Sequence, residues 1–245
     1  MINRLFVETK NKKCMNIAII LSGGVGSRMG LNIPKQYVMV NKRPVVSYCL
    51  QTFFINKRTD AVVIGVADEW KEFVKEQVDV LHPEKPVFYA QPGETRQYSI
   101  YNALKVVKES GYPDDSIVII HDAARPLVSH KLIDCCYDTC SRVDGVMPVI
   151  AVKDTTYYSE DGKKIKDLLD RSKLWAGQAP EAFIFGKYLK VHDEMSHDEL
   201  LKINGSTEIA FKNGMNVEMI KGDPMNFKIT TPEDLANFET IINQH

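Results

Sequence analysis

The sequence predicts an α/β fold, because short apolar runs alternate with segments of helical periodicity along most of its 245 residues. Apolar runs typical of buried strands occupy residues 16–21, 61–66, 86–90, 117–120 and 145–149. Helical patterns lie between them at 45–54, 69–79, 96–109 and 130–140. Strands joined by helices of this length form right-handed crossovers, so we expect a Rossmann-like, mostly parallel sheet with helices on both faces.

The regular alternation stops after the fifth apolar run. Residues 155–158 have a strand pattern, Glu160-Asp161-Gly162 a turn pattern and 163–168 the pattern of a return strand, which together predict a projecting β-hairpin arm. Residues 215–220 predict a further strand, and Thr231-Pro232 opens a final helix with an N-cap followed by proline. We expect one domain over residues 1–245, with an N-terminal extension at 1–15 and the arm at about 151–172.

The composition is that of an ordinary soluble protein, with 44% hydrophobic residues. Lys and Arg total 31 against 32 Asp and Glu, and the resulting net charge of −1 does not favour nucleic-acid binding. No apolar stretch reaches the length of a signal peptide or of a membrane span. Five cysteines without an export signal predict reduced thiols in the cytoplasm rather than disulfides or a zinc site.

A glycine-rich loop follows the first predicted strand, at the edge where a parallel sheet binds ligands. Closely spaced glycines let backbone N–H groups approach phosphate oxygens, and Arg28 adds a positive charge. The glycine spacing does not fit a dinucleotide fingerprint, and no Gly-Lys-Ser/Thr triplet completes a Walker A loop. For the loop alone, a tight turn with a surface arginine is the alternative interpretation. The loop residues in question are Ser22, Gly23, Gly24 and Gly26.

Lys35 follows in the segment Pro34-Lys35-Gln36, and on its own it would be an ordinary solvated lysine. Together, Arg28 and Lys35 can flank a triphosphate and neutralise the charge that develops on a transferring phosphorus. The pair of cations therefore indicates phosphoryl-type transfer.

Five ordered segments, from about residue 17 to the last helix, resemble the family of cytidylyltransferases for 2-C-methyl-D-erythritol 4-phosphate and ribitol 5-phosphate. The first segment is the glycine loop with Pro34-Lys35-Gln36-Tyr37. The others are Gly93-Glu94-Thr95-Arg96 with Ser99, His121-Asp122-Ala123-Ala124-Arg125-Pro126, Asp154-Thr155 with Arg171, and Asn226-Phe227-Lys228 onward to Leu235. The resemblance implies that a polyol phosphate attacks the α-phosphorus of CTP, forming a CDP-polyol for isoprenoid or for cell wall or capsule polymer synthesis and releasing pyrophosphate.

The same resemblance implies a role for each matching residue. The residues that would promote the transfer are Arg28, Lys35 and Lys228. The residues that would bind the nucleotide are Ser22, Gly23, Gly24, Gly26, Gly93, Arg96, Ser99, Asp122 and Ala123. Asp122 would also bind Mg²⁺. The polyol phosphate would contact Arg125 and, from the arm of a second subunit in a homodimer, Thr155 and Arg171.

Plainer interpretations of these residues stay open at this point. Arg96 and Ser99 could be ordinary residues of the first turn of a helix. Asp122 could be an N-cap, and Lys228 and the arm could belong to a solvated surface. The alternative functions are a hexose-1-phosphate nucleotidylyltransferase, a nicotinamide-dependent dehydrogenase and a non-catalytic nucleotide-binding module. The presence of Arg28, Lys35 and Lys228 together argues against a non-catalytic module.

The acceptor also stays open, between methylerythritol phosphate, ribitol phosphate and another pentitol or hexitol phosphate. The loop Leu21-Ser22-Gly23-Gly24 resembles the ribitol-phosphate enzymes, whereas His121-Asp122-Ala123-Ala124-Arg125 resembles the isoprenoid enzymes. Two segments near the acceptor depart from the family pattern. Gln178-Ala179-Pro180-Glu181 replaces the usual Gln-Thr-Pro-Gln, and Asn204-Gly205-Ser206-Thr207-Glu208 replaces a Thr-Asp pair followed by a second acid.

Overall fold

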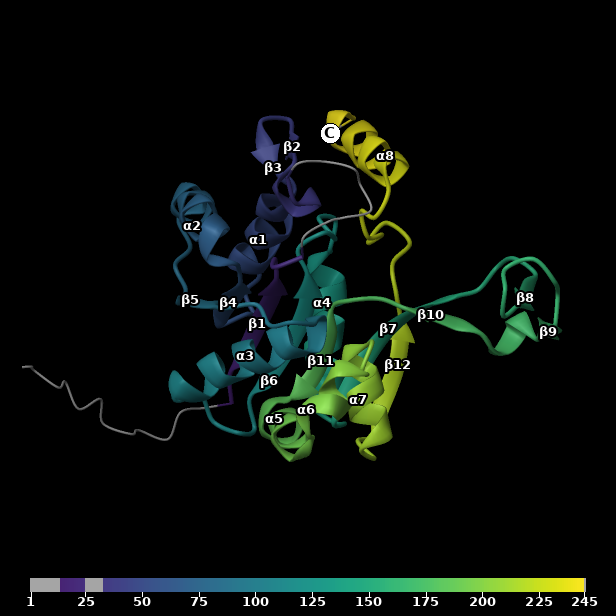
Figure 1. The fold of residues 1–245 in the computed structure, drawn as a ribbon. Helices are drawn as coiled ribbons and strands as arrows, with labels where there is room; N and C mark the ends of the chain where they lie inside the picture. The colour runs from purple at the N-terminus through teal and green to yellow at the C-terminus, as the bar shows by residue number, and fades with distance from the viewer. Residues whose placement is uncertain (1–13, 25–32, 245) are drawn as a thin grey trace, which may run out of the picture.

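The computed structural model describes residues 14–24 and 33–244, and it confirms the α/β fold (Figure 1). Most of the predicted extension at 1–15, together with Gly26 and Arg28, lies outside the described residues. The main sheet consists of β1 Asn16–Leu21, β4 Ala61–Gly65, β5 Val87–Ala90, β6 Ile117–Asp122, β7 Gly145–Ala151, β10 Trp175–Gly177, β11 Glu181–Ile184 and β12 Val217–Lys221. The helices are α1 Val45–Ile55, α2 Asp68–Leu81, α3 Arg96–Glu109, α4 His130–Cys140, α5 Phe185–Glu194, α6 His197–Leu201, α7 Ser206–Lys212 and α8 Pro232–Asn243.

Four neighbouring strands, β6, β1, β4 and β5, run parallel. Leu21 at the end of β1 pairs with Asp122 of β6 on one side and with Gly65 of β4 on the other. The three strands therefore end together, and the chain that leaves them gathers at one edge of the sheet. Ligands of parallel sheets bind at this edge.

The helices cover both faces of the sheet, and the alternation of β1 shows how. Ile17 and Ile19 pack into the core formed with α3, α5 and α7, whereas Ala18 and Ile20 pack into the core formed with α1, α2 and α4. Successive side chains of a strand point to opposite faces, so a strand buried on both faces is apolar throughout. This burial explains the uninterrupted apolar run that predicted β1.

The other half of the sheet contains antiparallel strands that the sequence analysis did not predict. β7 runs out toward the arm, and β10 returns beside it with Trp175 opposite Ala151. The chain then enters β11, which lies antiparallel between β6 and β7. Because β11 runs opposite to β6, its first residue, Glu181, lies opposite Ile120 and close to the carboxyl end of β6.

The predicted arm is present as a separate hairpin of β8 Thr156–Tyr158 and β9 Asp167–Leu169, and it projects away from the sheet (Figure 1). The predicted return strand at 163–168 was wrong in its position, since β9 begins only at Asp167. The carboxylate of Asp161 accepts hydrogen bonds from the backbone N–H groups of Lys163 and Lys164, at 2.8 and 2.9 Å. These bonds hold the residues before β9 in a wide turn instead of a strand.

The final helix begins as predicted. The hydroxyl of Thr231 accepts a hydrogen bond from the N–H of Asp234, and the carboxylate of Asp234 bonds back to the N–H of Thr231. Phe238 of this helix packs with Val45 and Ile229 in a small separate cluster. Among the helices of the described residues, none has an apolar stretch of the length that a bilayer crossing needs.

Candidate active site

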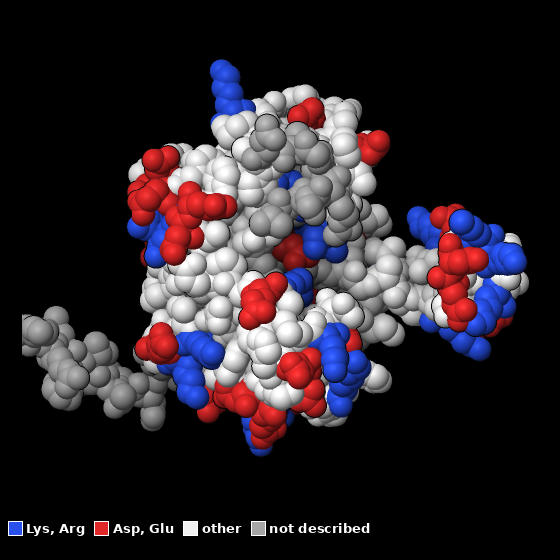
Figure 2. All heavy atoms as spheres, in the orientation of Figure 1, with Lys and Arg blue, Asp and Glu red and all other residues white. Residues whose placement is uncertain are grey.

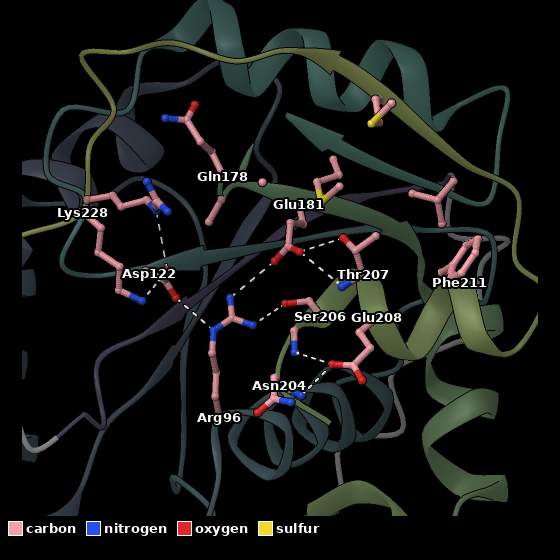
Figure 3. Close-up of a pocket in the computed structure, with 17 residues that line it drawn as sticks. Arg96, Asp122, Gln178, Glu181, Asn204, Ser206, Thr207, Glu208, Phe211 and Lys228 are labelled. Carbon is pink, nitrogen blue, oxygen red and sulfur yellow. Dashed lines mark hydrogen bonds and ion pairs between the residues drawn. The ribbon is translucent and has the colours of Figure 1, made fainter. Parts of the chain in front are cut away.

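A pocket of about 680 Å³ opens at the edge of the sheet where β6 ends and β11 begins (Figure 3). Figure 2 shows this face of the molecule hollowed near its centre, with basic and acidic side chains inside the hollow. The ionic and hydrogen-bonding side chains of the lining include Arg96, Asp122, Arg125, Glu181, Thr207 and Lys228. Four of these six were predicted as site residues from the sequence, whereas Glu181 and Thr207 were noted only as departures from the family pattern.

Asp122 is the point on which three cations converge. Its Oδ1 accepts a hydrogen bond from Nε of Arg96 at 3.1 Å, and its Oδ2 lies 2.9 Å from Nζ of Lys228. Nε of Arg125 lies 3.6 Å from the same Oδ2. Burial alone would raise the pKa of Asp122, but Arg96, Lys228 and Arg125 outweigh it and hold the pKa well below its usual range. The carboxylate is therefore ionised at any physiological pH, and the N-cap interpretation of Asp122 does not describe these contacts.

Arg96 stands between two buried carboxylates. It is the first residue of α3, whose N-cap Thr95 accepts a hydrogen bond from the N–H of Tyr98. Besides its bond to Asp122, it donates from Nη2 to Oε2 of Glu181 at 3.4 Å and from Nη1 to the hydroxyl of Ser206. Burial alone would lower the pKa of Arg96, but the two carboxylates together raise it above its ordinary value. This arginine is therefore a fixed positive charge, and its guanidinium donors already have protein partners.

Glu181 and Thr207 form a second part of the network. Oε1 of Glu181 accepts hydrogen bonds from the backbone N–H of Thr207 at 3.2 Å and from its hydroxyl at 2.7 Å. These contacts fasten the start of α7 to the start of β11 (Figure 3). The only sequence signal for them was the unusual acid at 181 and the unusual threonine at 207.

Arg125 and Lys228 are held by the turn that follows β6 and by the segment before α8. Nη1 of Arg125 donates to the carbonyl of Asn226 at 2.8 Å, and Asn226 in turn donates from its side chain to the carbonyl of Ala179 at 2.6 Å. Nε of Arg125 is buried without a hydrogen-bond partner in the described part of the chain. Its ion pair with Asp122, at 3.6 Å, is too long for a hydrogen bond, so this N–H can still donate to an anionic oxygen in the pocket.

His121 supports the turn rather than the chemistry. Its Nε2–H donates to the carbonyl of Arg125 at 3.0 Å, and its ring is fully buried against Phe53. Burial lowers the pKa of His121 to about 4. A histidine that is neutral at pH 7 adds no charge beside Asp122. The net charge of the cluster is therefore set by its arginines, its lysine and its carboxylates.

The predicted glycine loop leaves β1 at the same edge of the sheet. The N–H of Ala123 donates to the carbonyl of Leu21 at 3.0 Å, so Ser22 begins the loop beside Asp122 and Ala123. The buried side chain of Gln36 donates to the carbonyls of Ser22 and Gly24, at 2.7 and 2.8 Å. These contacts hold the loop against the short helix Lys35–Tyr37 and thereby place Lys35 next to the loop.

Tyr37 adds a second link to this loop, since its hydroxyl donates to the carbonyl of Ser22 at 2.8 Å and lies 2.9 Å from the hydroxyl of Ser22. Sequence reasoning quoted Gln36 and Tyr37 as part of a motif but gave them no function. The structure gives both a positioning function for the predicted phosphate-binding loop.

Gly93 and Ser99 lie together where the chain enters α3. The N–H of Gly93 donates to the hydroxyl of Ser99 at 3.0 Å, and that hydroxyl donates to the carbonyl of Thr95 at 2.9 Å. A Cβ on Gly93 would lie 2.2 Å from the Cβ of Tyr98, so no larger residue fits there without a shift of the backbone. Gly93 is thus required by the close approach of loop and helix, whatever else it binds.

Thr155 and Arg171 do not join the other predicted residues in this chain. Both are exposed on the arm, and Nη1 of Arg171 donates to the carbonyl of Lys153 at 2.7 Å. Neither belongs to the lining of the pocket described above.

The charges of the pocket favour an anion. Arg96, Arg125 and Lys228 all lie against the single carboxylate of Asp122. The other two acids of the lining lie elsewhere in it, where Glu181 binds Thr207 and Arg96, and Glu208 pairs with Lys212. The excess of positive charge is concentrated around Asp122 within a partly buried space, where electrostatic interactions are stronger than in water. A phosphate group fits this surplus of positive charge.

Comparisons with known proteins agree with this chemistry. The sequence model of the 2-C-methyl-D-erythritol 4-phosphate cytidylyltransferase family matches residues 16–244. The chain is 35% identical to a 2-C-methyl-D-erythritol 4-phosphate cytidylyltransferase of Clostridium beijerinckii, over 92% of this chain and 97% of that protein. It is 31% identical to a ribitol-5-phosphate cytidylyltransferase of Vibrio parahaemolyticus, over 94% of this chain and 96% of that protein. The crystal structure of the Francisella tularensis 2-C-methyl-D-erythritol 4-phosphate cytidylyltransferase superposes with a TM-score of 0.75 at 28% identity, over 92% of this chain and 99% of that chain.

Two neighbouring glycines of the loop offer a matched test of packing against binding. A Cβ on Gly23 would lie 2.5 Å from the Cβ of Pro92, whereas a Cβ on Gly24 would meet no atom of the described residues within 4 Å. We expect Gly23→Ala to destabilise the fold by about 1–3 kcal/mol, the usual effect of overpacking. Gly24→Ala should keep the melting temperature of the unchanged protein and weaken CTP binding, because its methyl group would occupy the space in front of the loop. Thermal melting with and without CTP measures both effects. Equal melting temperatures for the two variants would contradict the packing assignment.

Proposed function

The chain belongs to the 2-C-methyl-D-erythritol 4-phosphate cytidylyltransferase family, and we propose that it transfers the cytidylyl group of CTP to a polyol phosphate, with release of pyrophosphate. The chain is thus a nucleotidyltransferase. The relatives that it matches are named for methylerythritol phosphate and for ribitol phosphate, and the proposal covers both acceptors. The CDP-polyol would serve isoprenoid synthesis in the first case and a cell wall or capsule polymer in the second.

The observation that carries the proposal is the convergence of Arg96, Arg125 and Lys228 on Asp122. These cations come from three separate segments and meet beside the glycine loop that leaves β1. Transfer between two phosphate compounds needs this kind of fixed positive charge, because the protein contributes mainly alignment and charge neutralisation.

In the proposed reaction, a phosphate oxygen of the polyol phosphate attacks the α-phosphorus of CTP. The new bond joins that oxygen to the α-phosphorus, and the bond from the α-phosphorus to the oxygen bridging to the β-phosphorus breaks, so pyrophosphate leaves with both bonding electrons. A phosphate dianion is already nucleophilic near neutral pH, so no general base is needed. Holding the two reactants in register can lower the barrier by about 7–11 kcal/mol.

We assign the groups of the chain as follows. Arg28 and Lys35 neutralise the triphosphate, Lys228 faces the transferred phosphate, and Arg125 holds the phosphate of the acceptor through Nε, which makes no hydrogen bond among the described residues. The backbone from Ser22 to Gly26, with Gly93, Arg96, Ser99, Asp122 and Ala123, forms the nucleotide site.

We also propose that Asp122 holds Mg²⁺ when CTP is bound. The described residues contain no cluster of three potential metal ligands, and both oxygens of Asp122 already face cations. Mg²⁺ alone would be repelled by the three cations around Asp122. Mg²⁺ that already binds a triphosphate needs few protein carboxylates. The ion would withdraw charge from the phosphates of CTP.

The arm supports a homodimer, with Thr155 and Arg171 of one subunit at the acceptor site of the other. Several large apolar side chains of the arm are exposed, among them Leu168 and Ile165, at 60% and 68%. A second, largely apolar pocket of about 580 Å³ lies at the root of the arm, beside Trp175 and Met219. Exposed apolar surface of this kind marks an interaction site, and a second copy of the chain is the partner we propose.

We also propose that the protein is located in the cytoplasm. The thiols of Cys49 and Cys140 are buried, and burial raises the pKa of each to about 12. Thiols that stay protonated in the core are compatible with a reducing compartment.

Substitution of the lysine at the centre of the site tests the reaction. Lys228→Ala should lower kcat for pyrophosphate release by about 100-fold or more, because a charge aimed at the transition state is lost. Its melting temperature should stay close to that of the unchanged protein, since the Lys228 side chain is 35% exposed. The assay pairs CTP, ATP, GTP or UTP with methylerythritol, ribitol, arabinitol, glycerol and mannitol phosphates. The control is Lys75→Ala, since Lys75 is a partly exposed lysine of α2 outside the pocket. Near-normal turnover in Lys228→Ala would reject the assigned role.

The metal proposal predicts binding that depends on the nucleotide. Isothermal titration of the protein with Mg²⁺ alone should give no saturable heat, and titration in the presence of CTP should give a one-site isotherm. Asp122→Asn should weaken the second isotherm by at least about 10-fold. Saturable Mg²⁺ binding without CTP, or pyrophosphate release at an unchanged rate in EDTA, would contradict the proposal.

The shared site predicts complementation between two inactive variants. Arg171→Ala disables the arm, and Lys228→Ala disables the pocket, so each homodimer should be inactive. Co-refolded mixtures should regain about a quarter of the normal number of sites, because half of the random dimers contain one intact pocket served by one intact arm. The measurement is pyrophosphate release after mixing. A mixture as inactive as its components, from dimers verified by light scattering, would place Arg171 outside the site.

A further inference from the structure

Glu181 occupies an unusual position for an acidic residue. It is the first residue of β11, it is only 8% exposed, and it lines the pocket between the cations around Asp122 and an apolar wall. That wall includes Met147, Val217 and Met219. Burial of a carboxylate is costly unless donors surround it, so the partners of Glu181 define what this position requires.

All the partners of Glu181 are donors. Its Oε1 accepts hydrogen bonds from the N–H and the hydroxyl of Thr207, at 3.2 and 2.7 Å. Its Oε2 accepts one from Nη2 of Arg96 at 3.4 Å. A carboxylate only accepts and has about four acceptor positions. A glutamine here would have to turn its NH₂ group toward Thr207 or toward Arg96, and donor would face donor in either case. The geometry therefore suits a carboxylate and not an amide.

One acceptor position of Glu181, on Oε2, is not used by the described residues. The other polar groups on this side of the pocket also have protein partners. Gln178 accepts from the N–H of Asp223 and donates to its carbonyl, both at 3.0 Å, and Glu208 caps the start of α7 and pairs with Lys212. Glu208 also accepts three hydrogen bonds, but its side chain is 28% exposed, whereas that of Glu181 is 10% exposed. The free position of Glu181 is thus the carboxylate acceptor on this side of the pocket that is better shielded from water.

The position of Glu181 relative to the cations indicates which part of a ligand it faces. The guanidinium of Arg96 bridges Asp122 through Nε and Glu181 through Nη2, so the two carboxylates bind different nitrogens of one flat group and are held apart. The phosphate of an acceptor belongs on the side of Asp122, with Arg125 and Lys228. The carbon chain then extends past Arg96 toward Glu181, where the groups that can donate a hydrogen bond are its hydroxyls.

We infer that Glu181 is a specificity-determining residue for the acceptor, and that its Oε2 accepts a hydrogen bond from one hydroxyl of the polyol phosphate. This inference rests on the proposed function and deepens it. Thr207 and Arg96 hold the carboxylate in place, and the apolar side chains beside it offer no competing partner. A hydrogen bond to an ionised group should favour the hydroxyl-bearing acceptor over its deoxy analogue by about 10- to 100-fold.

The test combines one substitution with single deletions of acceptor hydroxyls. The polyol phosphate that the unchanged protein uses best is compared with its deoxy analogues, each lacking one hydroxyl, in Glu181→Gln and in the unchanged protein. In the unchanged protein, one analogue should react about 10- to 100-fold more slowly than the parent compound. In Glu181→Gln, the same analogue should react as fast as the parent compound. The KM for CTP should not change. Glu72→Gln, which removes an exposed acid of α2, is the control for lost charge and should retain the full discrimination.

The outcomes separate this inference from the proposed function. If the unchanged protein releases pyrophosphate from no pair of CTP and polyol phosphate, the proposed function fails and the inference fails with it. If it releases pyrophosphate but Glu181→Gln slows every analogue equally, or keeps the discrimination, only the inference is overturned. Thermal melting checks that the variants fold. Should Glu181→Gln not fold, Glu181→Asp withdraws the carboxylate from the pocket while keeping its charge, and it should lose the same discrimination.

Discussion

One buried guanidinium organises the site. Arg96 lies between Asp122 and Glu181, two carboxylates that would otherwise repel each other in a space closed to most solvent. Loss of one partner of a buried ionic group typically destabilises a protein by about 3–5 kcal/mol, because the remaining charge is left uncompensated. Arg96 also bonds to Ser206. The start of α3, the end of β6, the start of β11 and the start of α7 are therefore joined through a single side chain.

This junction depends on the direction of β11. In a fully parallel sheet, only the last residues of strands reach the ligand-binding edge. β11 is antiparallel to β6, so its first residue reaches that edge, and Glu181 lies opposite Ile120, two residues before Asp122. The direction of β11 follows from the path of the chain, which leaves the sheet along β7 into the arm and returns along β10. The arm is thus part of the reason that the pocket contains a second carboxylate.

The fold could be predicted from the sequence where its signals are local. The apolar run of β1, the helical periods and the N-cap at Thr231 depend on residues close together in the chain, and the structure contains those elements. β10 and β11 were missed because they have three and four residues, β10 ends in Gly177, and Pro180 directly precedes β11, which leaves no periodic pattern. Their strand character comes from pairing with β6 and β7.

The same distinction holds for the site. Asp122, Arg125 and Lys228 were predicted because each belongs to a segment that resembles the family. Glu181 and Thr207 could not be given a role, because their contacts join residues 26 positions apart and exist only in the folded chain. The positioning function of Gln36 was hidden in a similar way, since its amide bonds to carbonyl groups that no sequence pattern identifies.

The two sides of the pocket therefore differ in what they can tell about the function. In the proposed function its charged side, around Asp122, binds phosphate, which every acceptor of this reaction class carries, and the residues there match the family. In the same proposal its other side, with Glu181, Thr207 and the apolar wall, faces the part of the acceptor that differs from one polyol to another, and there the chain departs from the family. Membership of a family can thus establish the reaction while leaving the acceptor undetermined, because in the proposed function separate side chains, held apart by Arg96, govern the two.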